Sequence, residues 1–358
     1  MEKIKLNLGE LFSGPGGLAY GAINSSLEYG GTHYSYGHAW SNDIDHDSCQ
    51  TYIMNIPGAH SGSVYCEDIA LLNIDNLSSI DIFAYGFPCN DFSIVGKQKG
   101  FAGTYGPLYK YGINVINKFK PKFFIAENVG GIRSANDGEA FKKILNDLSN
   151  SGDGYDIVSH LYKAEEYGIA QTRHRIIIVG IQKSLELKYR VPAQTTKNNY
   201  IPVSKVLESI PFDAPNNEFT NQSKKVIERL KYISPGENVW TSKMPEHLRL
   251  NVENAKLSQI YKRLHPDKPS YTITGSGGGG THGYHYYENR ALTNRERAAI
   301  QSFPNDYAFF GAKESVRKQI GMAVPPALSK IIFESILKTY AKCPYLFIES
   351  NIDINYNA

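Results

Sequence analysis

The segment Gly86-Phe87-Pro88-Cys89 puts a thiol in a tight turn directly after a short apolar run at residues 80–85. The β-prone side chains of this run predict a buried strand, so Cys89 is expected at the strand's carboxyl end, where open α/β sheets bind their ligands. A thiolate in such a turn can act as a nucleophile. A single cysteine is also commonly an inert core residue, and the turn alone leaves both interpretations open.

Two later segments carry side chains that could act on a ring or a carbonyl group. Glu127 ends an apolar run, and a carboxyl group at a strand end beside an apolar wall can hold or share a proton. It could equally be an ordinary glutamate that faces solvent. Gln171, Arg173 and Arg175 alternate along a segment that enters another apolar strand, so both guanidinium groups are expected on one face, suited to phosphate or carbonyl oxygens. A solvated basic strand would show the same pattern.

A glycine-rich turn precedes all of these residues. Residues 11–18 read Leu-Phe-Ser-Gly-Pro-Gly-Gly-Leu, and glycines there let the backbone approach a ligand at the amino end of a helix. Asp43 and Asp68 end the next predicted strands, where carboxylates could accept hydrogen bonds from ribose hydroxyls and an adenine amino group. A plain tight turn and helix-capping aspartates are the alternatives.

The elements that must position these residues alternate along the first half of the chain. Strands are expected at residues 4–8, 38–42, 81–85, 122–127 and 175–180, and helices at residues 108–119 and 140–148. This alternation predicts a doubly wound α/β fold with a parallel sheet. After about residue 191 the periodicity fades, and a glycine run interrupts any regular element. Helical periodicity returns at residues 327–340, so we expect one large domain and one small, loop-rich domain.

Composition narrows the classes of function. No apolar run approaches the roughly 18 residues that span a bilayer, and the first residues lack the apolar core of a signal peptide, so we expect a cytoplasmic protein without a membrane partner. The four cysteines show no metal-ligand spacing, and we expect neither a disulfide nor a metal. Residues 181–300 contain 18 basic and 11 acidic residues, which fits either a nucleic-acid surface or a solvated one.

Six motifs in a fixed order together resemble the DNA cytosine-5 methyltransferase family. They are Phe-Ser-Gly-x-Gly-Gly from residue 12, Gly-Phe-Pro-Cys-x-x-Phe-Ser from 86, Glu-Asn-Val from 127, Gln-x-Arg-x-Arg from 171, Arg-Ala-Leu-Thr-Asn-Arg-Glu from 290 and Gln-Ile-Gly-Met-Ala-Val-Pro-Pro from 319. The resemblance covers about residues 6–340. It implies a Rossmann-like catalytic domain that binds S-adenosylmethionine (AdoMet), residues 1–190 with 316–358, and a target-recognition domain and hinge, residues 191–315.

The resemblance also implies roles for the matching residues. Cys89 would add to C6 of a cytosine that has been flipped out of duplex DNA. Glu127 would contact N3 and the exocyclic amine, Arg175 would hold the O2 carbonyl, and Arg173 would help to position the flipped nucleotide or its phosphate. The cofactor residues implied are Phe12, Ser13, Gly14, Gly16, Gly17, Asp43, Ile44, Asp68 and Pro88.

DNA contacts are expected in two segments. The loop at residues 94–106 follows the nucleophile, and its glycines with Lys97 and Lys99 suit a lid that closes over DNA, although a plain surface loop would look alike. The segment around the glycine run resembles the family's recognition core. Its candidate DNA-binding residues are Thr272, Ile273, Ser276, Thr281, His282, Tyr284 and His285.

The sequence departs from the family pattern in three places. Asn90 stands where glutamine is usual, Met322 stands where asparagine is usual, and residues 106–109 lack a common arginine. We still expect an active, monomeric modification enzyme of a bacterial restriction-modification system, with no obligate protein partner. The alternatives are a transfer-RNA cytosine methyltransferase and a catalytically inactive, DNA-binding member of the fold.

Overall fold

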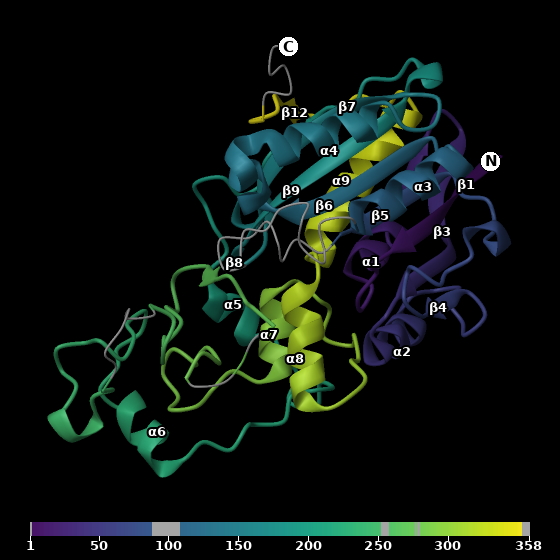
Figure 1. Cartoon of the computed structure of the whole chain (residues 1–358). Coiled ribbons are helices and arrows are strands. Elements are labelled where there is room, and N and C mark those ends of the chain that lie inside the picture. Colours follow the sequence, from purple (N-terminus) through teal and green to yellow (C-terminus); the bar gives the residue numbers. More distant parts are fainter. Residues whose placement is uncertain (1, 88–107, 252–257, 276, 278–279, 353–358) are drawn as a thin grey trace. The chain divides into compact units, whose positions relative to one another are not determined.

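The computed structural model describes residues 2–87, 108–251, 258–275, 277 and 280–352. The chain divides into two compact units (Figure 1). Unit 1 comprises Met1–Lys163, His174–Thr195 and Pro326–Ala358, and unit 2 comprises Ala164–Arg173 and Thr196–Pro325. Each unit is described by itself below.

Unit 1 is built on an eight-stranded sheet in the order β2-β3-β1-β5-β6-β9-β7, with β4 beside β3. The strands are β1 (Glu2–Leu11), β2 (Ser26–Tyr29), β3 (Thr32–Asp43), β4 (Val64–Cys66), β5 (Ile82–Gly86), β6 (Phe123–Val129), β7 (Tyr155–Lys163) and β9 (His174–Gln182). All five strands expected from the sequence are present. The expected parallel direction is wrong for β9, which runs antiparallel to both β6 and β7, so the sheet is mixed.

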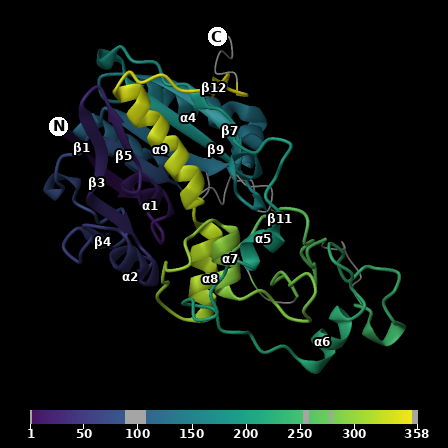
Figure 2. The ribbon, with the colours of Figure 1, turned by 180° about the vertical axis from the view of Figure 1, so that it is seen from behind.

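Helices cover both faces of this sheet. Figures 1 and 2 show α3 (Tyr109–Phe119) and α4 (Glu139–Ser149) on one face, and α1 (Gly17–Ile23) and α9 (Pro326–Tyr340) on the other, while α2 (His46–Asn55) follows β3. The three predicted helices correspond to α3, α4 and α9. Glycine is required where α1 meets α9, because a Cβ on Gly21 would lie 2.5 Å from the Ser329 side chain.

The sheet's strand order places its ligand-binding edge. The strands β3, β1, β5 and β6 are parallel neighbours, so their carboxyl ends share one edge. The chain moves from β1 outward to β3 and β4, then returns to β5 on the other side of β1. Ligands of open α/β sheets bind at such a switch point, outside the carboxyl ends of the strands.

Unit 2 contains little regular structure. Its helices are α5 (Val203–Leu207), α6 (Lys224–Leu230), α7 (Asn294–Ile300) and α8 (Lys313–Met322), and β8 (Gln171–Thr172) pairs with β11 (Ser270–Tyr271). A small apolar core gathers Leu230, Val239, Tyr261 and Tyr284. The sparse helices and strands leave many backbone groups that need other partners.

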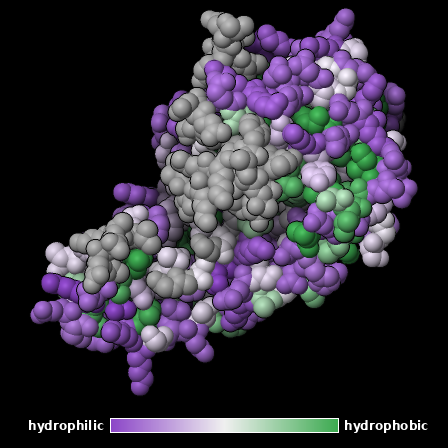
Figure 3. Space-filling model, viewed as in Figure 1, coloured by the Kyte–Doolittle hydropathy of each residue, from purple (hydrophilic) through white to green (hydrophobic). Residues whose placement is uncertain are grey.

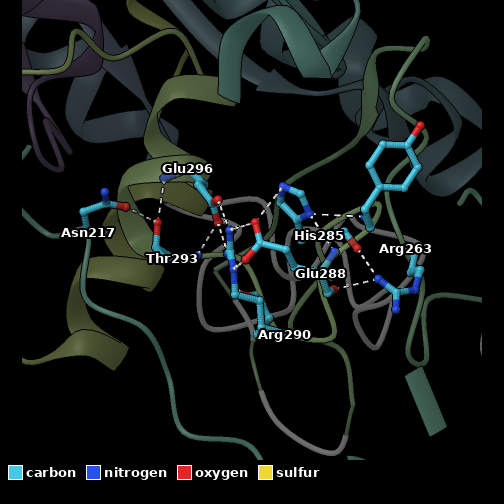
Figure 4. Close-up of polar contacts among 9 residues, drawn as sticks. Asn217, Arg263, His285, Glu288, Arg290, Thr293 and Glu296 are labelled. Carbon is cyan, nitrogen blue, oxygen red and sulfur yellow. Dashed lines mark hydrogen bonds and ion pairs between the residues drawn. The ribbon is translucent and has the colours of Figure 1, made fainter. Parts of the chain in front are cut away.

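Buried polar side chains supply many of those partners (Figure 4). Arg263 donates to the carbonyl oxygens of Leu230, His285 and Glu288 at 2.8, 2.6 and 2.7 Å. Thr293 and Glu296 form a capping box at the start of α7, and Arg290 bridges Glu288 and Glu296. Unit 2 is therefore held together largely by hydrogen bonds from side chains to loops.

Apolar surface lies beside the ligand-binding edge of unit 1. Figure 3 shows hydrophobic side chains among polar ones over the part of unit 1 that contains α1, α2 and β4. The large exposed apolar side chains of these elements and their loops are Ile44, Met54 and Leu71. Among the described residues, Lys313–Tyr340 is long and apolar enough to cross a membrane, but 72% of its most apolar window is buried in the protein, as in a core helix.

Candidate active site

The glycine-rich turn follows β1 at the carboxyl edge of unit 1. Phe12, Gly14 and Gly16 have φ values of 54°, 52° and 91°, and a positive φ is uncommon for a bulky residue such as phenylalanine. A Cβ on Gly16 would lie 3.0 Å from the Tyr52 ring, whereas none of the described atoms lies within 4 Å of the same position on Gly14. Gly16 thus permits internal packing, while Gly14 borders open space.

The next strand ends contribute Asp43 and Asp68, as the sequence predicted for their positions. Asp43 accepts from the N–H groups of Gly14 and Asp45 at 2.7 and 2.9 Å, so its carboxylate fixes the turn. The Ile44 side chain is 69% exposed. Asp68 is exposed and accepts from the Ala70 N–H at 2.9 Å. These residues and the turn line the edge beside β1 and β3.

Glu127 and Arg175 form an ion pair at the same edge. The Arg175 Nε lies 2.8 Å from the Glu127 Oε1, and the two side chains are 14% and 12% exposed. Glu127 pairs across the β6/β9 ladder with Ile177, two residues from Arg175, so strand alternation places both side chains on one face. A Cβ on Gly86 would lie 3.0 Å from the Glu127 carboxylate, which puts the end of β5 directly beside this pair.

Asn128 has a role that the sequence did not indicate. Its side-chain amide donates to the Phe87 carbonyl at 3.2 Å, and its side-chain oxygen accepts from the Val129 N–H at 2.8 Å. The end of β6 thereby holds the backbone two residues before Cys89. Five predicted site residues lie outside the described residues: Pro88, Cys89, Lys97, Lys99 and Ser276.

Arg173 lies in unit 2, and its side chain binds backbone carbonyl oxygens there. The side chain is 1% exposed and donates to the carbonyl oxygens of Ile273, Gly321 and Ala323 at 3.1, 3.0 and 3.0 Å. Alternation along a strand had suggested that Arg173 and Arg175 act together. The regular strand is interrupted between Thr172 and His174, so the alternation rule does not apply across Arg173.

The predicted DNA-binding residues fall into two groups in unit 2. Ile273 and Tyr284 are 2% and 1% exposed, and Tyr284 belongs to the apolar core, so packing accounts for both side chains. Thr272, Thr281 and His282 are partly exposed, and the Thr272 hydroxyl donates to the Thr172 carbonyl at 2.6 Å. His285 is buried, and its Nδ1 accepts from the backbone of its own loop.

A buried acid lies behind the glycine-rich turn. Glu10 is 1% exposed, and burial raises the pKa of its carboxyl group well above the usual range. It accepts from the Tyr52 hydroxyl at 3.2 Å, and Tyr52 also contacts the His38 Nδ1 at 3.3 Å. Burial lowers the pKa of His38 to about 4. An acidic residue among apolar neighbours directly before the turn was the signal in the sequence that could have found this network.

The chain is similar to known proteins over most of its length. Residues 6–338 match the family model for C-5 cytosine-specific DNA methylases. The chain is 56% identical to the type II methyltransferase M.BbvI of Brevibacillus brevis, over 98% of this chain and 96% of that protein. It is 38% identical to the type II methyltransferase M.NgoFVII of Neisseria gonorrhoeae, over 92% and 86% of the two chains.

A solved structure supports the same fold. The Entamoeba histolytica methyltransferase EhMeth superposes with a TM-score of 0.64 at 15% identity, over 95% of this chain and 98% of that chain. The family match and the identities to M.BbvI and M.NgoFVII cover nearly the whole sequence. This chain therefore belongs to the family of C-5 cytosine-specific DNA methylases.

Proposed function

We propose that this protein transfers a methyl group from AdoMet to C5 of a cytosine in a short, specific sequence of duplex DNA. Its family makes it a DNA (cytosine-5-)-methyltransferase. The observation that carries the proposal is the Glu127–Arg175 pair at 2.8 Å. A guanidinium group can only donate and a carboxyl group can accept or share a proton, which suits the O2 and the N3/amine edge of a cytosine.

The proposed chemistry starts from the fact that cytosine C5 is a poor nucleophile. The Cys89 thiolate forms a bond to C6, and the displaced ring electrons make C5 nucleophilic. Glu127 shares a proton at N3, and Arg175 stabilises negative charge at O2. After methylation, loss of the C5 proton breaks the C6–S bond and restores aromaticity. Cys89 enters this scheme through its place in the family motif.

The residues of the glycine-rich turn fit AdoMet. The Ser13 Oγ is buried and lacks a hydrogen-bond partner among the described residues, and the space beside Gly14 is open. Both features suit the methionine end of the cofactor, while the exposed Ile44 offers an apolar surface for the adenine. Asp43 would hold the ribose and Asp68 the adenine amino group. When bound, AdoMet supplies an electrophilic methyl group.

We assign cofactor binding and catalysis to unit 1, and recognition of the DNA sequence to unit 2. The sequence suggested that residues 316–358 belong to the catalytic domain. The helix α8 lies in unit 2, so we assign α8 to the recognition domain instead. Because C5 and C6 are inaccessible in a stacked duplex, the target cytosine must flip out. We keep the lid role for residues 94–106, with Lys97 and Lys99 on phosphates.

We further propose that the enzyme is the cytoplasmic, monomeric modification half of a restriction-modification system. The support is its similarity to two type II methyltransferases. A transfer-RNA methyltransferase would use the same catalytic motifs, and an inactive DNA-binding protein would keep the fold. Duplex DNA, transfer RNA and AdoMet in one assay separate these three functions.

The deciding experiment is covalent trapping. After bisulfite sequencing of DNA from an expressing host gives the methylated sequence, a duplex with 5-fluorocytosine at the target is incubated with protein and AdoMet. The fluorine cannot leave as a proton does, so the adduct should persist on wild-type protein. Cys89→Ser should form no adduct. Cys343→Ser is the matched control and should form the adduct normally.

Three results would overturn the proposal. They are an absence of 5-methylcytosine in duplex DNA, an adduct that survives Cys89→Ser, and methylation of transfer RNA in place of DNA.

A further inference from the structure

Unit 2 buries six of its arginines, which is unusual for a residue that is always charged. All six donate to backbone carbonyl oxygens of the unit: Arg173, Arg229, Arg263, Arg295, Arg297 and Arg317. Two of them, Arg297 and Arg317, are 3% and 7% exposed and both also contact His282. Two buried positive charges thus converge on one partly exposed histidine.

The two arginines contact different parts of His282 and its loop. Arg297 donates to the His282 carbonyl oxygen. Arg317 lies 3.5 Å from the His282 Nδ1 through one nitrogen and donates through another to the Gly277 carbonyl at 3.3 Å. The buried Arg317 Nε has no hydrogen-bond partner among the described residues. The histidine is therefore fixed through both its backbone and its ring.

The described glycines of this loop make the contacts with Arg317 and α8 possible. A Cβ on Gly277 would lie 2.2 Å from the Arg317 Nε, so only glycine leaves room for the guanidinium group. A Cβ on Gly321 of α8 would lie 1.9 Å from the Gly275 nitrogen. Gly275, Gly277 and the His282 ring thus each contact residues of α8. These glycines serve contacts within the protein as well as any approach to DNA.

This arrangement selects one form of the imidazole. A guanidinium group has no acceptor, so a hydrogen bond between Arg317 and the His282 Nδ1, 3.5 Å apart, requires that Nδ1 accept and that the ring proton sit on Nε2. Burial lowers the pKa of His282, the charges of Arg317 and Arg297 lower it further, and Glu314 opposes them. The lowered pKa favours the neutral ring, whose N–H donor is then Nε2, and no hydrogen bond of Nε2 is found within the described chain.

We infer that Arg317 is a positioning residue for sequence readout, which holds His282 so that its Nε2–H donates to a base-edge acceptor in the major groove. This inference rests on the proposed function, because it takes duplex DNA as the substrate. The acceptors that face the major groove are purine N7, guanine O6 and thymine O4. A fixed, neutral donor distinguishes these atoms from the amino groups of adenine and cytosine. A charged imidazolium could bind any phosphate and would not make this distinction.

The test is a discrimination scan. Wild type, His282→Ala and Arg317→Gln are assayed for kcat/KM on the methylated sequence and on duplexes with one base pair changed at a time. We expect both variants to lose about tenfold discrimination at one and the same position, the lower part of the range for a single base-edge contact. The double variant should lose no more than either single one, because both act through one contact.

Two further variants separate positioning from folding. Gly277→Ala keeps Arg317 but forces its guanidinium group away from residue 277, and should reduce discrimination at the same base pair. Arg295→Lys removes a buried arginine near the start of α7 that donates to the Pro215 and Pro304 carbonyls, and should lower thermal stability without changing discrimination.

The outcomes are distinguishable. Failure to methylate any duplex overturns the proposed function and this inference with it. Methylation with unchanged discrimination in His282→Ala, or loss at different positions in His282→Ala and Arg317→Gln, overturns this inference alone.

Discussion

The two units use arginine in opposite ways. Unit 1 contains Arg133, Arg175 and Arg190, all at least partly exposed, and Arg175 pairs with a carboxylate at the ligand-binding edge. Unit 2 buries six arginines, and all six donate to backbone carbonyls. Arginine thus pairs with a carboxylate at the sheet edge of unit 1, whereas in unit 2 buried arginines bind the backbone of their own unit.

The difference follows from how each unit satisfies its backbone. The sheet and helices of unit 1 pair most N–H and C=O groups with each other. The short helices of unit 2 leave carbonyl oxygens unpaired, and a guanidinium group with five donors can bind several at once. Positive charge in the sequence is therefore a poor measure of the DNA-facing surface here, because part of the excess at residues 181–300 lies in the interior.

The largest expected effect is on Arg175 in unit 1. Arg175→Ala removes the partner of Glu127 and the donor proposed for the cytosine O2, and should lower kcat by about 100- to 1,000-fold, as for loss of one transition-state donor. The side chain is 14% exposed and its loss removes this partner of Glu127, so some loss of stability should accompany the loss of kcat. The measurement is methyl transfer to the cognate duplex together with urea unfolding. A stability loss without a kcat loss would assign Arg175 to architecture and remove the contrast between the units.

The matched change in unit 2 is Arg173→Ala, at a position only two residues before Arg175 in the sequence. It leaves three buried carbonyl oxygens without their donor, which should lower the free energy of unfolding by about 3 kcal/mol. Urea unfolding followed by circular dichroism measures this loss. Variant protein that is still folded should bind AdoMet with wild-type affinity, because the proposed cofactor residues are in unit 1. Unchanged stability with lost turnover would make Arg173 a site residue instead.

Much of unit 1 was predictable because its elements are strongly periodic. The strands at residues 81–85 and 122–127 are apolar on both faces, and the helices at 108–119 and 140–148 have clear stripes; all four are confirmed. The antiparallel direction of β9 was missed, since strand direction depends on where residues 164–173 lead the chain, and local periodicity carries no such information.

The polar partners were much less predictable. Alternation suggested one role for Arg173 and Arg175, and the pattern could not reveal that Arg173 reaches carbonyls 100 to 150 residues away in sequence. Tyr284 was predicted to contact DNA because it follows the glycine run, but long-range packing buries it. The Glu127 partner was within reach of prediction, because both residues belong to regular strands.

A smaller effect tests whether local capping also matters to unit 2. Thr293→Ala removes the side chain that accepts from the Glu296 N–H at 3.0 Å and should lower the free energy of unfolding by about 1 kcal/mol, a typical cost for a lost helix cap. Thr293→Ser is the control and should retain most of that stability. A loss as large as that of Arg173→Ala would show that caps support unit 2 as much as buried arginines do.

Acidity should act on unit 1 through a buried histidine. His160 is 3% exposed, and burial lowers its pKa to about 4 from an ordinary value of 6.5. Between these values the unfolded chain binds the proton and the folded protein does not, so the free energy of unfolding falls as the pH drops from about 6.5 towards 4. The urea midpoint at pH 7 and pH 5 measures the fall. His160→Gln should reduce it, because glutamine does not titrate.

Glu10 affects the pH dependence of stability in the direction opposite to His160. Burial raises the pKa of Glu10, so that group stabilises the folded protein as the pH falls and partly offsets His160. Only the difference between wild type and variant isolates the histidine. His46→Gln is the matched control at an exposed position, because the His46 side chain is 68% exposed. An equal fall in wild type and His160→Gln would mean that carboxylates, and not a buried neutral histidine, limit the acid stability of unit 1.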